Sequence, residues 1–203
     1  MPGTEHTSAH DVLLTTAVEL GRRIFGAGAC SVALLEDDSE HLVFRAATGE
    51  GAQEVLGLRI PVSTGIAGLT VSSGEPIAVD HVERDPRFAR EVAEATGYVP
   101  RTILAAPLET SQDVLGVIEV LDRTPVANRD DLGLLSLLAH HLAIALELRA
   151  RVEAEASPGA LGEVGDLLAE LGRLGTAEQH AAAGLLRVFV DHVRRSGGPS
   201  RLV

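Results

Sequence analysis

The chain has 203 residues, of which 45% are hydrophobic and 23% charged, and its formal net charge is −12. A chain of this length and apolar content can bury one substantial core and a small appendage. Nonspecific binding to nucleic acid depends on clustered cations, so an acidic chain is not expected to have a nucleic-acid partner.

The cysteine count and the first residues bear on the cell compartment. One cysteine, Cys30, excludes an internal disulfide and any paired-cysteine redox or zinc motif. Residues 2–10 are polar and lack the basic start and apolar core of a signal peptide. No uninterrupted apolar run approaches the roughly 20 residues that a membrane helix needs. We therefore expect a cytoplasmic protein without a membrane partner.

The N-terminal third predicts a tail, a helix and a β-hairpin. Residues 1–8 are expected to form a flexible tail. Apolar side chains recur at three- and four-residue steps from Val12 to Ile24, which predicts an amphipathic helix that ends before Gly26. Residues 30–36 and 41–47 are short apolar runs on either side of a polar turn, and they predict two paired strands.

The middle of the chain alternates short helices with extended segments. Residues 53–56 favour a short helix, and 58–62 are expected to be extended because Pro61 disfavours helix at the residue before it. The glycine-punctuated segment 65–73 predicts a helix that closes one face of a sheet. A strand at 77–80, a polar loop and an irregular helix within 85–97 are expected to follow.

Two strands and a long helix complete the predicted domain. Residues 103–108 and 114–122 have strand patterns, separated by a polar turn. Residues 129–156 form the strongest helical pattern, without an interior proline. Between Leu132 and Leu148 this segment is apolar on nearly every side, so we expect it to contact a second apolar surface besides the sheet.

The C-terminal part predicts a helical extension. Ser157, Pro158 and Gly159 interrupt the long helix and mark a boundary. Residues 160–174 and 177–195 then favour a helical hairpin, so 157–203 are expected to form an appendage. Its apolar positions are too few for an independent fold.

The order of these segments resembles that of the GAF domain family, whose members are small-molecule-sensing modules of signalling proteins. The resemblance is carried by the glycine-punctuated turn 64–76, the polar loop 80–88 and the strand pair within 103–122, and it covers residues 9–156. It implies an α+β fold with a central antiparallel sheet of about five to six strands. The N- and C-terminal helices would cover one face, with short helices and lid loops on the other. It also implies a stand-alone bacterial module that forms a homodimer through those two helices.

Polar and aromatic residues at the expected pocket walls are the candidate ligand-binding residues. They are His81, Phe88, Tyr98, Arg101, Thr102 and Glu119. Glu119 interrupts an apolar strand, so if it is buried it needs a partner, and Arg45, Arg101 or a ligand cation are the options. If Glu119 instead lies at a wet edge, it needs none. The strand alternation does not say which face is the pocket.

No enzyme signature is present. The chain lacks a nucleophile elbow, a zinc-protease helix and a Walker loop, so we expect a non-enzymatic protein without a metal site. Cyclic-nucleotide-binding GAF domains carry a lysine in their motif, and this chain has no lysine. The sequence thus predicts a sensing or regulatory module that acts on a partner signalling protein, with an unknown small molecule and an unknown cofactor. A ligand-free interaction scaffold and a haem-based gas or redox sensor using His81 are the alternatives.

Overall fold

The computed structural model describes residues 9–125 and 129–156. The predicted tail, 1–8, and the predicted C-terminal extension, 157–203, lie outside the described residues. The chain separates into two compact units, 1–150 and 151–203, and the first unit contains the whole sheet.

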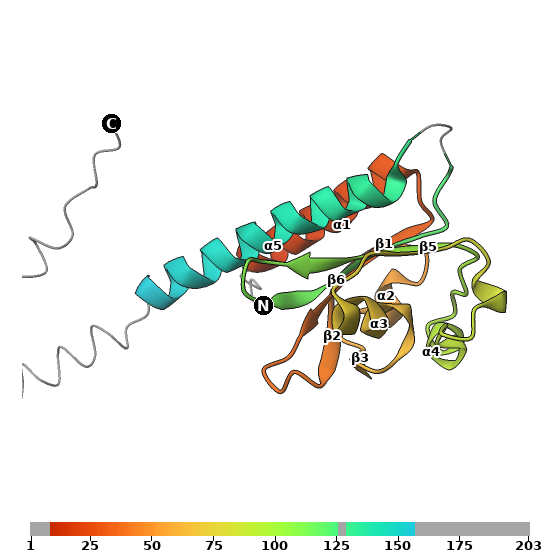
Figure 1. Cartoon of the computed structure of the whole chain (residues 1–203), viewed down its shortest axis with the longest axis horizontal. Helices are drawn as coiled ribbons and strands as arrows, with labels where there is room; N and C mark the ends of the chain where they lie inside the picture. The colour runs from red at the N-terminus through yellow and green to blue at the C-terminus, as the bar shows by residue number, and fades with distance from the viewer. Residues whose placement is uncertain (1–8, 126–128, 157–203) are drawn as a thin grey trace, which may run out of the picture. The chain divides into compact units, whose positions relative to one another are not determined.

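Six strands form one antiparallel sheet in the order β3-β2-β1-β6-β5-β4 (Figure 1). The elements follow along the chain as α1 (Ala9–Phe25), β1 (Ala29–Leu35), β2 (His41–Gly49), α2 (Ala52–Val55), β3 (Arg59–Pro61), α3 (Gly65–Ser73), β4 (Ile77–Val79), η1 (Val82–Arg84), α4 (Arg90–Ala95), β5 (Ile103–Glu109), β6 (Val114–Leu121) and α5 (Asp131–Ala156). The predicted α+β GAF-like architecture is confirmed.

The sheet is built from two hairpins joined through its centre. β1 pairs with β2 and β5 pairs with β6, and β1 then pairs with β6, so that the first and last strands are neighbours. These central strands are apolar on both sides, as strands covered by other elements on both faces are. The edge strands β3 and β4 have three residues each, and short edges limit pairing with other chains.

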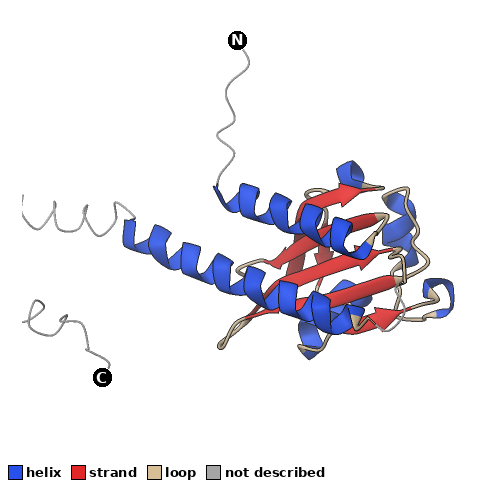
Figure 2. Cartoon of the chain, turned by 90° about the horizontal axis from the view of Figure 1, so that it is seen from above, coloured by secondary structure: helices blue, strands red, loops and turns tan. Residues whose placement is uncertain are grey.

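Helices cover both faces of the sheet. α1 and α5 lie across one face (Figure 2), and α2, α3 and α4 lie on the other. Two hydrophobic clusters fill the two interfaces. The sequence left open which side chains of β1 face which layer. Cys30 and Val32 pack under α1 and α5, whereas Ala33 packs on the other face.

The long helix α5 is apolar on more than one side. Its buried face, which includes Leu135, Ala139 and Leu142, packs on the sheet. By length and mean hydropathy, residues 131–152 could cross a membrane. The segment was not recognised in the sequence because polar residues interrupt its apolar runs. The core helix of a soluble protein passes the same test, and one face of α5 packs on the sheet, with 33% of this window buried.

The short helix expected within 85–97 is confirmed as α4, Arg90–Ala95, and a 3-10 turn, η1, precedes the segment. The Asp85 carboxylate accepts hydrogen bonds from the backbone N–H and the guanidinium of Arg87. These local bonds stabilise the turn between η1 and α4.

Candidate functional site

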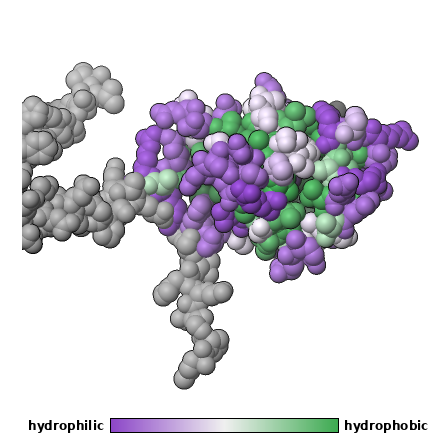
Figure 3. Space-filling model, turned by 90° about the horizontal axis from the view of Figure 1, so that it is seen from below, coloured by the Kyte–Doolittle hydropathy of each residue, from purple (hydrophilic) through white to green (hydrophobic). Residues whose placement is uncertain are grey.

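A pocket lies on the sheet face opposite α1 and α5. It encloses about 100 Å³ and is bounded by the sheet, by α2 and α3, and by the segment from Phe88 to Pro100. Figure 3 views this side of the molecule and shows hydrophobic residues gathered at its centre with hydrophilic residues around them. The apolar walls include Phe44, Val55, Ile60, Ile66, Val92, Ile103 and Leu121.

Glu119 is the charged residue of the pocket floor. It lies in β6, where its strand neighbours are Ser31 and Ala105, and only 8% of its surface is exposed. Burial raises the pKa of its carboxyl group to about 7, because a carboxylate loses the hydration that stabilises it in water. Among the described residues, no hydrogen bond or ion pair reaches this carboxyl group.

Tyr98 forms part of the wall and is held by Asp122. Its hydroxyl donates a 2.6 Å hydrogen bond to Asp122 Oδ2, while Asp122 Oδ1 accepts from the backbone N–H groups of Arg101 and Thr102 at 2.7 and 3.0 Å. Burial and the neighbouring carboxylate raise the pKa of the Tyr98 hydroxyl. One carboxylate at the end of β6 therefore ties the pocket wall to the sheet.

Two glycines make room for the Tyr98 ring. A Cβ atom at Gly28 would lie 2.6 Å from the Tyr98 hydroxyl oxygen, and one at Gly51 would lie 2.8 Å from Tyr98 Cβ. Gly51 also has a φ of +68°, a conformation that glycine adopts without strain. The absence of a side chain at these two glycines therefore leaves the space that Tyr98 occupies in the pocket wall.

The structure brings together three of the six candidate residues. Phe88, Tyr98 and Glu119 line the pocket. The other three candidates, His81, Arg101 and Thr102, are not among its lining residues. Their role in ligand binding, and that of the three lining residues, stays a prediction.

Two of the three candidates outside the lining, His81 and Arg101, lie at the surface. His81 is exposed, with its side chain 69% accessible, and lies 3.6 Å from the carboxylate of Glu83. Arg101 is also exposed and contributes its backbone N–H to the Asp122 contact. Arg45 is exposed on β2, so neither arginine that was considered as a partner for Glu119 pairs with it.

Several lining residues were not identified from the sequence. The polar ones are Ser31, Thr48, Glu50, Thr64 and Thr96. Ser31 was a detectable case, because it is a hydroxyl within an apolar strand and lies directly opposite Glu119. Glu50 and Thr96 lie in loops or at helix ends, where no periodic pattern marks the inward side.

The thiol of Cys30 belongs to the helix side of the sheet. Cys30 is fully buried in the cluster under α1 and α5, and a Cβ atom at Gly21 of α1 would lie 3.0 Å from its sulfur. Burial raises the pKa of the thiol to about 12. Cys30 is therefore a core residue, and a protonated and inaccessible thiol is a poor nucleophile.

An acidic cluster outside the pocket is already paired with an arginine. Glu36, Asp38 and His41 lie near one another at the hairpin of β1 and β2. Arg59 of β3 donates to Glu36 at 2.6 Å and to Asp38 at 2.8 Å, and His41 contacts Asp38 at 2.8 Å. The guanidinium thus occupies the place that a bound cation would take.

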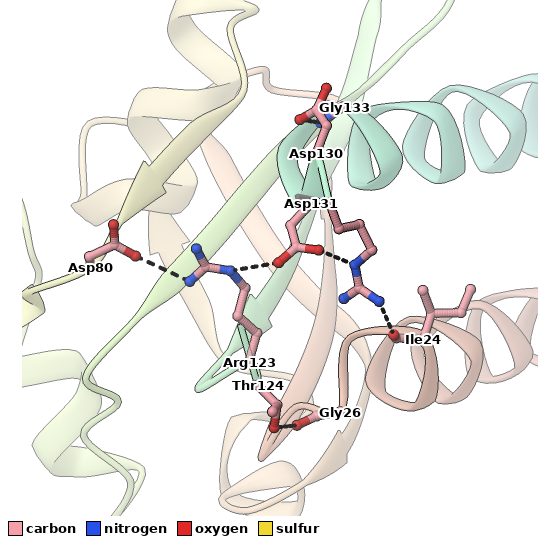
Figure 4. Close-up of polar contacts among 9 residues, drawn as sticks. Ile24, Gly26, Asp80, Arg123, Thr124, Asp130, Asp131 and Gly133 are labelled. Atoms are coloured by element: carbon pink, nitrogen blue, oxygen red, sulfur yellow. Dashed lines mark hydrogen bonds and ion pairs between the residues drawn. The ribbon is translucent and has the colours of Figure 1, made fainter. Parts of the chain in front are cut away.

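A chain of ion pairs joins the end of β6 to the helices (Figure 4). Arg123 contacts Asp80, which follows β4, at 3.1 Å and Asp131, the first residue of α5, at 3.2 Å. Asp131 also accepts from Arg129, whose guanidinium donates to the backbone oxygen of Ile24 in α1 at 3.3 Å. Arg123 directly follows Asp122, which holds the pocket wall.

Comparison with known proteins identifies the fold. The family model of the GAF domain matches residues 9–146. The chain belongs to the GAF domain family. It is thus a regulatory domain of the small-molecule-binding GAF type, and the resemblance found in its sequence is confirmed.

Related GAF domains occur in proteins of several kinds. The chain is 26% identical over 149 residues to a probable 3′,5′-cyclic phosphodiesterase of Caenorhabditis elegans. The matched region covers 67% of this chain but only 20% of that protein. Its fold is similar to that of a GAF domain from a Coxiella burnetii phosphoenolpyruvate-protein phosphotransferase, with a TM-score of 0.61 and 22% identity over 72% of this chain and 86% of that one.

An enzyme also shares this GAF fold. It is the free methionine-R-sulfoxide reductase of Neisseria meningitidis, solved with its substrate, with a TM-score of 0.55 and 22% identity over 75% of this chain and 83% of that one. At this identity the likeness concerns the fold. It is not evidence that this GAF domain shares the activities of these proteins.

Proposed function

We propose that this GAF domain is a non-enzymatic cytoplasmic sensor that binds a small molecule in the pocket over Glu119 and signals to a partner protein as a homodimer. The observation that carries the proposal is a carboxyl group that burial has stripped of hydration, in the lining of an apolar pocket of about 100 Å³. A carboxylate in such a place is stabilised when a partner replaces its lost hydration. A ligand in the pocket can provide that partner.

The pocket favours this sensor over the two alternatives. A scaffold whose pocket is filled by its own side chains would leave no cavity, whereas this pocket retains open volume. A haem sensor needs an axial ligand, and among the described residues no histidine lines the pocket. The exposed position of His81 removes the residue on which that alternative rested.

The surroundings of Cys30 support a non-enzymatic role. Reduction of a sulfoxide by cysteine begins with attack by a reactive thiolate, and such a thiolate needs access and a low pKa. Cys30 has neither, since it lies beneath α1 with a raised pKa. The only cysteine of the chain is thus unsuited to such chemistry.

A route for the signal runs from the pocket to the helices. Tyr98 in the pocket wall bonds to Asp122, and the next residue, Arg123, pairs with Asp131 at the start of α5. A ligand that displaces Tyr98 changes the position of Asp122 and hence of the Arg123 guanidinium. Because α5 begins in this network, its first turn is where the change would reach the helices.

Exposed apolar residues on the two long helices support a homodimer. Val12 and Leu20 of α1 and Leu137, Ile144 and Leu148 of α5 are all exposed large hydrophobic residues. Residues 137, 144 and 148 follow the spacing of one helix face. Contiguous apolar surfaces of this kind are typical of protein interfaces.

Native mass spectrometry of protein purified without added ligand tests the sensor proposal. Extra mass that the Glu119→Gln variant does not retain would support a ligand held by this carboxyl group. Hydrogen exchange with and without the released molecule should then differ at the start of α5. A clean apo mass, with no small molecule changing exchange at α5, would favour the interaction scaffold.

A further inference from the structure

We propose that the pocket ligand is a compact aliphatic amine, whose protonated nitrogen pairs with the Glu119 carboxylate while its hydrocarbon part fills the apolar walls. The inference rests on the proposed sensor function and names the chemical class of its ligand. It follows from the carboxyl groups that line the pocket, from the absence of a cation among the described lining residues, and from the volume of the cavity.

The part of the chain that the structure describes provides no cation for Glu119. Three partners are conceivable for a buried carboxylate at this position: Arg45, Arg101 or a cation from outside the chain. Both arginines are exposed and neither contacts Glu119. Among the described residues, no arginine or histidine lines the pocket, and the chain has no lysine. The remaining partner is a cation that comes with the ligand.

The charge of the pocket selects against other ligand classes. The other ionisable groups on its walls are the Glu50 carboxyl group and the Tyr98 hydroxyl. An anionic ligand would meet two carboxyl groups and no cation, which is repulsive in a cavity shielded from water. A purely apolar ligand would leave Glu119 buried and unpaired, at the cost of its lost hydration.

A protonated amine satisfies both requirements of the site. An ammonium group offers three N–H donors, so it can pair with the Glu119 carboxylate and still donate to a neighbour. Ser31 lies directly across the strand pair from Glu119 and brings a hydroxyl to the same floor. A charge-assisted pair of this kind is stronger than a neutral hydrogen bond.

The cavity limits the size of the hydrocarbon part. Its volume of about 100 Å³ exceeds the roughly 15 Å³ that one water needs by the same measure, and it is below the roughly 150 Å³ of an engineered cavity that admits benzene. A branched or linear amine of about five heavy atoms fits between these limits. The surrounding walls are aliphatic or aromatic, with Ile60, Ile66 and Ile103 among them.

Binding should depend on pH through Glu119. The pKa of its carboxyl group is about 7 in the empty pocket, whereas an alkylamine keeps its proton up to about pH 10, as lysine does. The neighbouring Cys30 and Tyr98 have raised pKa values and keep their protons in this range, and Glu50 is the remaining ionisable group of the lining. Affinity for the amine should therefore rise about tenfold from pH 6 to pH 8.

Calorimetric titration with three matched probes tests the proposal on the full chain. Isobutylamine, isobutanol and isobutyrate share the same branched four-carbon skeleton and differ in the group that would meet Glu119. We expect isobutylamine to bind at least tenfold more tightly than the other two at pH 8. Glu119→Gln, which is nearly isosteric, should weaken amine binding about ten- to hundredfold.

The acidic surface of the chain requires a control. With a net charge of −12, the protein attracts cations in general. Glu40 is exposed in the loop between β1 and β2, away from the pocket lining. Glu40→Gln should leave amine affinity unchanged in 0.15 M salt. An equal loss in Glu40→Gln and Glu119→Gln would overturn the proposal, since binding would then be to the surface.

Failure of the amine class can be distinguished from failure of the sensor function. If isobutanol binds the wild type as tightly as isobutylamine at pH 8, the amine class is wrong, but the pocket still binds a small molecule. If the amine binds Glu119→Gln and the wild type equally, the carboxylate contact is wrong. If none of the three probes binds, the amine class is also wrong, and extra mass in native spectra then decides separately whether the sensor function stands.

Discussion

Replacing Glu119 by glutamine should raise the free energy of unfolding of the empty domain at neutral pH. Below pH 4.5 the effect of the substitution on this free energy should hardly depend on pH. The carboxyl group has a pKa of about 7 when folded, against an ordinary value of 4.5. The folded state therefore holds the proton more tightly than the unfolded state does. Wild-type stability should fall as the pH rises from 4.5 to 7 and level off above that, where both states are ionised.

The magnitude follows from the difference between the two pKa values. A rise from 4.5 to about 7 corresponds to about 3 kcal/mol of unfolding free energy, at about 1.4 kcal/mol per pKa unit. Glutamine has a similar shape and does not ionise. The free energy of unfolding of Glu119→Gln minus that of the wild type should thus increase by about 3 kcal/mol between pH 4.5 and pH 8.

Urea denaturation of both proteins, dialysed free of small molecules and measured from pH 4.5 to pH 8, provides the comparison. Other titrating groups are common to both proteins and cancel in the difference. At pH 8 the melting temperatures should differ by roughly 6–12 °C for a domain of this size. Glu40→Gln, at an exposed loop residue, is the matched control for the loss of one carboxyl group. A flat difference for Glu119→Gln would show that its carboxyl group is hydrated or already paired.

Three further predictions concern the pocket wall, the helices and the core. Tyr98→Phe removes the hydrogen bond to Asp122 and should lower the free energy of unfolding by about 1–3 kcal/mol in urea denaturation; an unchanged value would mean that the hydroxyl is not bonded. Leu148→Glu should convert the proposed dimer into a monomer in light scattering, whereas Ala150→Glu, exposed on another side of α5, should remain dimeric; dissociation of both or neither would contradict the proposed interface. Cys30 should react with a thiol reagent only after unfolding, because it is buried and its pKa is about 12; rapid labelling of the native protein would refute its placement in the core.

The fold was predictable because its elements have strong local patterns. The short apolar runs of β1, β2, β5 and β6 and the long proline-free helical pattern of α5 each specify one kind of element. The start of α4 at Arg90 was less predictable, because the Asp85 side chain bonds to the backbone of Arg87 in the turn before the helix. Such local bonding depends on side-chain geometry that periodicity does not reveal.

The pocket was predictable only in part, since alternation identifies two faces without distinguishing them. β1 and β6 are buried on both sides, so no polar stripe marks the outside. Glu119 was recognisable because a charge interrupts an apolar strand. His81 and Arg101 were assigned to the site from their place in a loop, and loops orient side chains by tertiary contacts that a single sequence does not contain.

The position of Tyr98 gives this domain a built-in optical probe. The chain has one tyrosine and no tryptophan, so its intrinsic ultraviolet fluorescence comes essentially from a single ring in the pocket wall. The carboxylate of Asp122 accepts the hydrogen bond from that ring's hydroxyl, and emission from tyrosine is sensitive to such an acceptor. Occupancy of the pocket can therefore be followed in the unmodified protein, without a dye or an introduced label.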